Sequence, residues 1–303
     1  MLEYKTLKKG IIMIKSYDKL SKELKEEICR KFEVNYDFEA LKKLYPEIDH
    51  ITLYSILNAA GKYHDKIYPS LPQIDISEKK IIFMSDTQFG SKYENLSYTY
   101  DLFDFAIKNG YHIVLHGGDI IEGNINRRRN MTSIRQAHYF IDKFPHDDSI
   151  TTHALYGNHD FLAMQRNEDI RAVLESREDV NMLGFKKAYI RWNGNTISLQ
   201  HDIDNYKISM PIKAEYISFA GHSHYYHIRP KNKYKNEKIY IPAMCEDAVY
   251  LTSNPNLTGV VHKPGFLTAE IDDTSINVSH YSFEPNGIVK EDEFQKLLKK
   301  KNI

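Results

Sequence analysis

Hydrophobic spacing along the chain changes once, close to residue 76. Before that point apolar side chains recur at helical spacing, as at Leu20, Leu24, Ile28 and Phe32. After residue 79 the apolar positions form short unbroken runs, beginning with 81–84. Short unbroken apolar runs are typical of strands that are buried on both faces. The pattern therefore predicts a small helical region followed by a larger region built on sheets.

The order of elements after residue 79 indicates an α/β architecture. Strands alternate with helices at first, and later strands follow one another closely, which is typical of a sandwich of mixed sheets. The expected helices are 98–108, 132–144 and 168–175, and the expected strands are 81–84, 112–115, 150–156, 188–192, 196–200, 216–220, 238–241, 266–271 and 276–283.

The chain is expected to contain two domains and a tail. A stretch rich in proline, Tyr68-Pro69-Ser70-Leu71-Pro72, interrupts both patterns and separates the two regions. We expect a helical N-terminal domain at 1–76, a main domain at 77–287 and a charged, lysine-rich helical tail at 288–303.

Composition excludes some classes of function. The chain has 303 residues with 41 basic and 41 acidic side chains, so no overall field draws it to nucleic acid or to an anionic membrane. The two cysteines, Cys29 and Cys245, support neither a disulfide framework nor a thiolate metal site. Any metal must therefore bind through oxygen and nitrogen. Without a signal-like apolar segment or a membrane span, we expect a cytoplasmic location.

Four polar blocks carry the candidate chemistry, and each directly follows an apolar run. They are Ser85-Asp86-Thr87-Gln88, Gly117-Gly118-Asp119, Gly157-Asn158-His159-Asp160 and Gly221-His222-Ser223-His224, and a lone His201 lies between the last two. The ends of strands are where an α/β sheet presents ligand-binding side chains. Aspartate, asparagine, glutamine and histidine suit a pair of divalent metals, which indicates a metal-dependent hydrolase.

The series Asp-x-Gln, Gly-Gly-Asp, Gly-Asn-His-Asp, a single histidine and Gly-His-Ser-His resembles the calcineurin-like metallophosphoesterase superfamily. The resemblance covers roughly residues 79–285. That superfamily includes protein phosphatases, purple acid phosphatases, cyclic-nucleotide phosphodiesterases and nucleases. The resemblance implies a four-layer αββα sandwich of two mixed sheets, here behind a small all-α N-terminal domain.

The resemblance also implies a two-metal site. Asp86, Gln88 and His224 would hold the first metal, Asn158, His201 and His222 the second, and Asp119 would bridge both. Two cations roughly 3.5–4 Å apart clamp a phosphate and acidify a water, whose hydroxide attacks phosphorus. His159 would protonate or steady the leaving group, and Asp160 would orient His159 through a hydrogen bond.

Gln88 departs from the family pattern, which usually has a histidine at this position. An amide oxygen in place of an imidazole shifts preference from zinc or iron toward manganese or magnesium. One interpretation is a site tuned for Mn²⁺ or Mg²⁺, and the other is an eroded ligand that leaves a single tight metal. We expect two divalent cations, with Mn²⁺ favoured over Mg²⁺, Zn²⁺ and Fe.

Two basic segments are candidates for holding the substrate. Arg127, Arg128 and Arg129 follow Asp119 and could bind phosphates, or could form a solvated face. After the last block, basic residues interleave with tyrosines over 225–238, a composition that suits either a nucleic-acid backbone with stacked bases or an exposed hairpin.

A segment of the N-terminal region, 48–57, resembles the turn and recognition helix of a helix-turn-helix module. Ile48 and Leu53 have the spacing of its two packed apolar positions, and Asp49 could serve as the N-cap. Against this, Lys43 and Pro46 fit the preceding helix poorly, and 1–76 has 13 basic and 12 acidic residues. A docking or core-covering role is the alternative.

Three functions follow from these observations. The first is a phosphodiesterase that acts on nucleic acid, which the N-terminal domain helps to bind. The second is a phosphomonoesterase or protein phosphatase with the helical domain as a lid or docking surface. The third is a noncatalytic DNA-binding protein on a phosphoesterase fold, which the nearly complete ligand set disfavours.

Overall fold

The computed structural model describes residues 20–35, 41, 43–48, 52–53, 56–57, 73–123, 131–165, 170–185, 187–201, 215–230, 237–246 and 263–298. The chain divides into two compact units. One comprises Met1–Ser70 with Asp204–Met210, and the other comprises Leu71–Ile203 with Pro211–Ile303. None of the helices in the described ranges is long and apolar enough to cross a membrane.

The smaller unit contains the amphipathic helix α1 (Lys22–Asn35). Ile28 of this helix is fully buried and belongs to a cluster of apolar side chains that also includes Leu41, Ile48, Leu53 and Ile56. Ile48 and Leu53, the two expected packed positions of the helix-turn-helix module, are 1% and 0% exposed. The intervening residues 49–51 lie outside the described ranges. The helix-turn-helix module stays a prediction.

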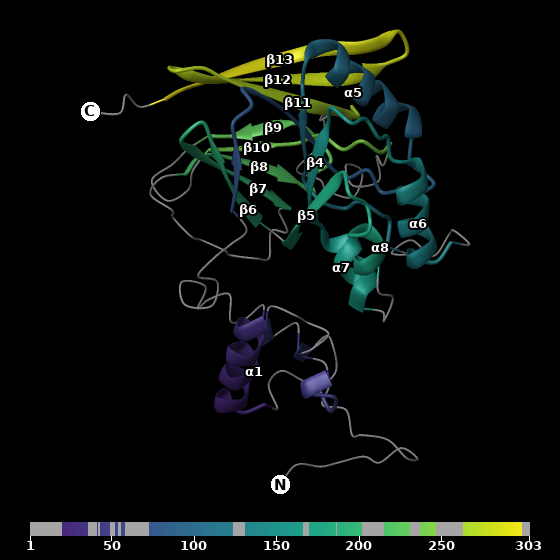
Figure 1. The fold of residues 1–303 in the computed structure, drawn as a ribbon, viewed down its shortest axis with the longest axis vertical. Coiled ribbons are helices and arrows are strands. Elements are labelled where there is room, and N and C mark those ends of the chain that lie inside the picture. The colour runs from purple at the N-terminus through teal and green to yellow at the C-terminus, as the bar shows by residue number, and fades with distance from the viewer. Residues whose placement is uncertain are drawn as a thin grey trace, which may run out of the picture. The chain divides into compact units, whose positions relative to one another are not determined.

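The larger unit contains two mixed sheets (Figure 1). The seven-stranded sheet has the order β13 (Gly287–Leu297), β12 (Ser275–Glu284), β11 (Gly265–Ile271), β2 (Lys80–Met84), β3 (Ile113–His116), β4 (Thr151–Tyr156) and β5 (Val180–Phe185). Strands β2 to β5 are parallel, and β11, β12 and β13 are antiparallel to their neighbours.

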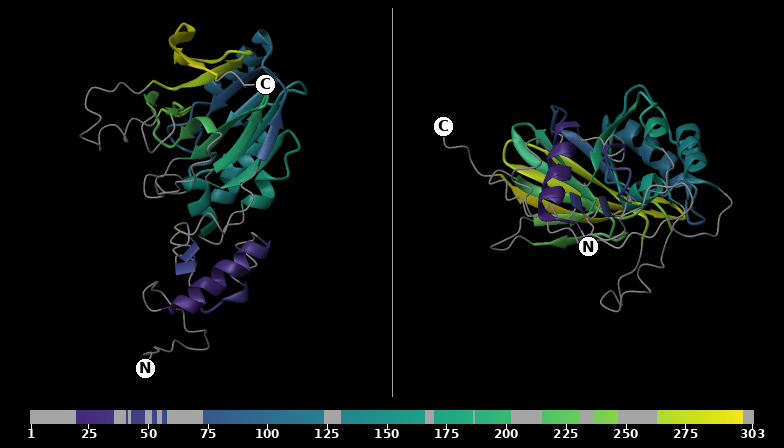
Figure 2. Two further views of the ribbon diagram at one scale, coloured as in Figure 1. Left: turned by 90° about the vertical axis from the view of Figure 1, so that its left-hand side faces the viewer. Right: turned by 90° about the horizontal axis from the view of Figure 1, so that it is seen from below.

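The six-stranded sheet has the order β1 (Gln73–Ile76), β6 (Lys187–Trp192), β7 (Asn195–His201), β8 (Glu215–Gly221), β10 (Glu237–Tyr240) and β9 (His227–Arg229). Its central strands β7, β8 and β10 run parallel to one another. Figure 2 shows the two sheets from two further directions.

Helices α5 (Leu96–Asn109), α6 (Ser133–Lys143), α7 (Asn158–Gln165) and α8 (Arg171–Leu174) lie on one side of the pair of sheets (Figure 1). Side chains of β2 point alternately to the two faces of the seven-stranded sheet, so this sheet contributes to two hydrophobic cores. Ile82 and Met84 pack with the helices, whereas Ile81 and Phe83 face the six-stranded sheet. Both faces of β2 are therefore buried, as its unbroken apolar run predicted.

The core between the sheets is aromatic at its centre. Phe83 of β2 and Phe219 of β8 stack with ring centroids 3.8 Å apart and an interplanar angle of 14°. Trp192 at the end of β6 is fully buried, and its Nε1–H donates to the carbonyl of Glu78 over 2.7 Å. These contacts join the sheets and confirm the predicted α/β sandwich. The outer helical layer on the six-stranded sheet stays a prediction, because residues 202–214 lie outside the described ranges.

The predicted helical tail at 288–303 is wrong over the described residues, because 287–297 form β13. Pairing of Glu284 with Gly287 leaves a two-residue turn, Pro285-Asn286, between β12 and β13. Asn-Gly beside a strand is a strong hairpin signal. Beyond the turn, Phe294 and Leu298 are half-buried against the core at strand spacing, which the lysine content concealed.

The predicted boundary at residue 76 is also displaced. Strand β1 pairs in parallel with β6, so residues 73–76 form part of the sandwich. The boundary between the compact units lies at Ser70–Leu71 instead, within the proline-rich stretch.

Truncation of Phe83 to alanine is expected to lower the free energy of unfolding by about 3–5 kcal/mol, because it removes a fully buried ring from the centre of the sandwich. Urea denaturation measures the loss. The matched control is Ile107→Ala on the outer surface of α5, where the side chain is 47% exposed and the change should stay within about 0.5 kcal/mol. Equal effects of the two substitutions would contradict the assigned core.

Candidate metal centre

The predicted ligands lie at the carboxyl ends of parallel strands in both sheets. Asp86 follows β2, Asp119 follows β3, and Asn158 follows β4, three adjacent strands of the seven-stranded sheet. His201 ends β7 and pairs in register with Gly221 of β8, which places it beside the block that contains His222. Ligands that are up to 138 positions apart in the chain therefore meet because the strands before them are neighbours.

The backbone at this site is strained in one consistent way. Six described non-glycine residues have positive φ angles, and five of them are predicted ligands: Asp86 (54°), Gln88 (46°), Asp119 (56°), His222 (79°) and His224 (63°). A left-handed conformation costs a non-glycine residue about 1–3 kcal/mol, and such strain concentrates at functional sites. The strained residues lie just after the ends of β2, β3 and β8, where the predicted ligands are.

Two glycines of the motifs are required by close packing. A β-carbon on Gly157 would overlap the Asp119 carboxylate, and one on Gly221 would overlap the Ser85 hydroxyl. Only glycine lets these backbones approach so closely. The glycines in the motifs thus allow the strand ends to meet.

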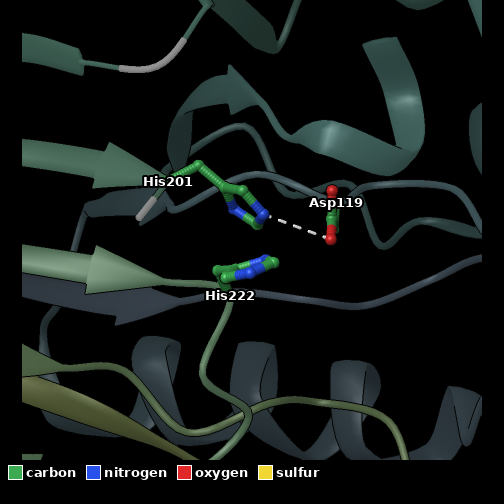
Figure 3. A group of neighbouring side chains, drawn as sticks. All are labelled: Asp119, His201 and His222. Atoms are coloured by element: carbon green, nitrogen blue, oxygen red, sulfur yellow. Dashed lines mark ion pairs between the residues drawn. The ribbon is translucent and has the colours of Figure 1, made fainter. Parts of the chain in front are cut away.

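Asp119, His201 and His222 form the first group of ligands (Figure 3). Their ligand atoms lie within 4.8 Å of one another. The Nε2 of His201 is 3.2 Å from Oδ2 of Asp119 and 2.9 Å from Oδ1 of Asn158. The rings of His201 and His222 are 5.1 Å apart and meet edge to face. All four residues predicted for the second metal and the bridge therefore converge.

The hydrogen bonds of His201 define which of its nitrogens faces the group. Its Nδ1 lies 2.8 Å from the carbonyl oxygen of Gly117, which can only accept, so Nδ1 carries a hydrogen. In the neutral ring, Nε2 then presents a lone pair to the oxygens of Asp119 and Asn158. Three lone pairs that converge in a buried space repel one another unless a cation or a proton lies among them.

The charges around His201 favour its protonated form. Burial lowers the pKa of His201, but the charge and hydrogen bond of Asp119 outweigh burial and raise this pKa to about 9. Burial raises the pKa of Asp119, and the charges of His201 and His159 bring it well below its usual range. The pocket thus favours positive charge between these side chains.

Asp86, Gln88 and His224 form the second group. Oδ1 of Asp86 is 3.3 Å from Nε2 of His224, and the Gln88 amide nitrogen is 3.4 Å from the same atom. The other oxygen of Asp86 accepts the backbone N–H of His222 at 2.9 Å, which fixes the carboxylate. Burial lowers the pKa of His224, but Asp86 and a hydrogen bond with Cys245 leave it well above its usual value.

The residues fit divalent cations. Oδ1 of Asp86 and Oδ2 of Asp119 are buried, and apart from the histidine nitrogen that each faces, no hydrogen-bond donor within the described ranges reaches them. A buried carboxylate oxygen without a donor is costly unless a cation binds it. The donors are all oxygen and nitrogen, which suits Mn²⁺, Mg²⁺ or Zn²⁺ better than a thiolate-binding metal.

His159 lies beside the first group. Its backbone N–H donates to Oδ1 of Asp119 at 2.8 Å, and its ring Nδ1 donates to the carbonyl oxygen of Glu122 at 2.9 Å. Its Nε2 therefore faces the site, 3.7 Å from Oδ2 of Asp119.

The role expected for Asp160, to orient His159 by a hydrogen bond, is wrong. The fully buried carboxylate of Asp160 accepts instead from the backbone N–H groups of Gly157, Ile120 and Ile121 at 2.8–3.2 Å. Burial and the charge of Asp119 raise the pKa of Asp160 to about 6. Asp160 thus ties the loop after β3 to the loop after β4, and the carbonyl of Glu122 takes over the orientation of His159.

Two buried polar residues beside the ligands, Thr87 and His116, were not predicted; they are 4% and 1% exposed. The available signal was a histidine at the end of the otherwise apolar run 113–116, directly before Gly-Gly-Asp. The candidate substrate residues Arg127, Arg128 and Arg129 lie outside the described residues and stay a prediction.

The two sheets and the ligands at their joined ends define a metal-binding α/β sandwich. A family model of calcineurin-like phosphoesterases matches residues 79–244, more than half of the chain. The chain therefore belongs to the calcineurin-like phosphoesterase family, as the four motifs indicated.

Several solved structures are similar to this chain at low sequence identity. Vacuolar protein sorting 29 from Cryptosporidium parvum is 13% identical, covers 72% of this chain and 98% of its own, and gives a TM-score of 0.44. A predicted phosphoesterase from Streptococcus pneumoniae is 14% identical over 73% of this chain and 99% of its own, with a TM-score of 0.39. A novel archaeal phosphodiesterase is 14% identical over 72% and 99%, also with a TM-score of 0.39. No curated protein matches the sequence.

Substitution of Asp119 by asparagine is expected to weaken Mn²⁺ binding by more than about 100-fold. Removing a residue that only hydrogen-bonds to a ligand weakens metal binding by about 10–100-fold, and loss of a charged ligand should weaken it more. Electron paramagnetic resonance of free Mn²⁺ measures the affinity. Asp142→Asn on the exposed end of α6 is the control and should bind Mn²⁺ as the wild type does. Unchanged binding by the Asp119 variant would contradict the assigned centre.

Gln88→His is expected to raise the affinity for Zn²⁺ relative to Mn²⁺, because an imidazole replaces the neutral amide of Gln88, which lies next to His224. Calorimetric titration of both metals gives the ratio. If neither affinity changes, Gln88 is not a ligand and the family difference at this position has no effect on metal choice.

Proposed function

We propose that this protein is a metal-dependent phosphodiesterase that acts on nucleic acid. The observation that supports hydrolysis most directly is the convergence of Asp119, His201 and His222 at the strand ends of a calcineurin-like phosphoesterase fold. Left-handed strain at non-glycine residues concentrates at functional sites, and here it falls on the residues that would bind the metals.

The two ligand groups define where the cations would bind. Asp86, Gln88 and His224 would hold one, Asn158, His201 and His222 the other, and Asp119 would lie between them. Bound divalent cations would neutralise phosphate charge and lower the pKa of a water so that hydroxide is present near neutral pH. The mixed oxygen and nitrogen donors favour Mn²⁺.

His159 would supply the proton for the leaving oxygen. Its Nδ1 is held by the carbonyl of Glu122, so the ring presents Nε2 to the site. The backbone of His159 is fixed in turn by the Asp119 carboxylate. General acid catalysis needs a donor atom in a defined position, and these two hydrogen bonds provide it.

A ladder of stacked rings supports a nucleic-acid substrate over a small monoester. Tyr225, which directly follows the ligand His224, stacks on His227 at 4.7 Å, and His227 stacks on Tyr240 at 3.8 Å. Arg229 lies 3.5 Å from the Tyr240 hydroxyl, and Lys238 lies over the Tyr240 ring. Tyr240 and Lys238 are buried and support the ladder from below, whereas Tyr225, His227 and Arg229 are half-buried. Half-buried rings beside a cation suit the bases and phosphates of single-stranded nucleic acid.

Not every tyrosine of this segment can contribute. Tyr226 points into the space between the sheets, where it stacks on His280 at 4.3 Å and donates to Asp292 at 2.9 Å. Tyr225 instead stacks on His227, the first residue of β9. The other basic candidates, Lys231, Lys233 and Lys235, lie outside the described residues. Delivery of DNA by the N-terminal region remains part of this proposal.

Two nitrophenyl esters test the proposal. With Mn²⁺, the protein should hydrolyse bis-nitrophenyl phosphate and a single-stranded oligonucleotide, with little activity on nitrophenyl phosphate. Activity on the monoester alone would support a phosphomonoesterase or protein phosphatase instead. If the protein binds Mn²⁺ but hydrolyses neither ester, the fold serves a noncatalytic role.

The role of His159 is tested by the leaving group. His159→Asn keeps a donor for the Glu122 carbonyl but has no proton to give at the Nε2 position. Its rate should fall by about 10²–10⁴-fold with an oligonucleotide, whose alkoxide must be protonated, and far less with bis-nitrophenyl phosphate. Equal losses with both substrates would show that His159 does not act as the acid.

A further inference from the structure

A relay of buried hydrogen bonds through Thr87 and His116 connects the Asp86–Gln88 loop to the loop that carries Asp119. The side chains of the ligands take no part in this relay. Thr87 lies between Asp86 and Gln88, and its hydroxyl is 3.0 Å from Nε2 of His116 and 3.0 Å from the carbonyl oxygen of Ile120. Nδ1 of His116 accepts the backbone N–H of Gly118 at 3.1 Å. The relay thus joins the middle of the Asp86–Gln88 loop to Gly118 and Ile120, the two neighbours of Asp119.

Only one arrangement of hydrogen atoms allows all the hydrogen bonds of the relay to form. Because Nδ1 of His116 accepts from Gly118, the hydrogen of the neutral ring is on Nε2 and is donated to Thr87. The Thr87 hydroxyl then donates to Ile120. Burial lowers the pKa of His116 to about 4, so the ring is neutral near pH 7 as this arrangement requires. Every bond has a fixed direction.

The bonds act on backbone that is otherwise strained. Asp86, Gln88 and Asp119 all have left-handed φ angles between 46° and 56°. Backbone bonds from Asp86 to Gly118 and from Gln88 to Asp119 also cross between the loops, at 2.9 and 3.1 Å. The side-chain relay adds links that run over the same interval and that depend on polar side chains alone.

The relay also reaches the ligand His201. Gly118, whose N–H is bound by His116, lies so close to His201 that a β-carbon on it would be 2.8 Å from Nδ1 of that ring. Fixing Gly118 therefore fixes the surface against which His201 rests. One relay touches the loops of Asp86, Gln88 and Asp119 and supports His201.

If Thr87 and His116 only filled space, apolar side chains could do so without needing hydrogen-bond partners. Both are buried, and buried polar groups are tolerated only when they are hydrogen-bonded. Outer partners that orient ligands commonly change metal affinity by about 10–100-fold. We infer that Thr87 and His116 are positioning residues that set the separation of the Asp86–Gln88 loop from Asp119 and thereby the affinity of the centre for divalent cations. This inference rests on the proposed metal-dependent function.

Mn²⁺ binding to the full chain tests the inference without an activity measurement. Thr87→Val keeps the shape of the side chain but removes the hydroxyl, and Thr87→Ser keeps the hydroxyl and removes only a methyl group. The valine variant should bind Mn²⁺ about tenfold or more weakly than the wild type, and the serine variant within about twofold. Resonance of free Mn²⁺ gives the affinities, and melting of the metal-free proteins shows that both variants are folded.

His116→Gln provides a second, independent variant. Its amide nitrogen can still donate toward Thr87, but its side chain has no acceptor in the Nδ1 position for Gly118, so Mn²⁺ affinity should fall here too. This variant decides the matter if Thr87→Val does not fold. Wild-type affinity in the folded Thr87→Val or His116→Gln protein would overturn the relay while the proposed function stands. A wild-type chain that binds no Mn²⁺ would overturn both.

Discussion

Buried acceptor atoms that face one another are the constraint on which this structure depends. Carboxylate oxygens of Asp86 and Asp119 lie 3.2–3.3 Å from imidazole nitrogens of His224 and His201, and no other hydrogen-bond donor within the described ranges reaches those oxygens. Among buried groups this arrangement is stable only with positive charge between them. The pKa values of both histidines are raised because the carboxylates favour a positive charge beside them. Divalent cations would supply more positive charge than protons.

The fold creates this situation by bringing strand ends together from two sheets. The seven-stranded sheet supplies Asp86, Asp119 and Asn158, and the six-stranded sheet supplies His201 and the block after β8. Stacking of Phe83 on Phe219 joins the sheets through the core. Left-handed turns then direct the side chains into the pocket, and the carboxylate of Asp160 ties the loops after β3 and β4. Packing of the sandwich and electrostatics of the site therefore support each other.

The sequence predicted the sandwich and the convergence of ligands because apolar runs and the polar blocks that follow them are local signals. It did not predict the strand at 287–297, where lysines concealed a strand period, or β1, which is short and follows prolines. Nor did it predict the partners of individual atoms. Asp160 was expected to hold His159, but which acceptor reaches a ring nitrogen depends on loop geometry, and the Glu122 carbonyl takes that place. The relay through Thr87 and His116 was not predicted for the same reason.

A crystal structure of the protein soaked with Mn²⁺, with anomalous scattering to locate the metal, would show whether cations bind among these side chains. We expect two peaks about 3.5–4 Å apart, a separation typical of two-metal sites. One peak should lie among Asp119, Asn158, His201 and His222, and the other among Asp86, Gln88 and His224. Crystals saturated with Mn²⁺ that show no metal at Asp119 would contradict this expectation.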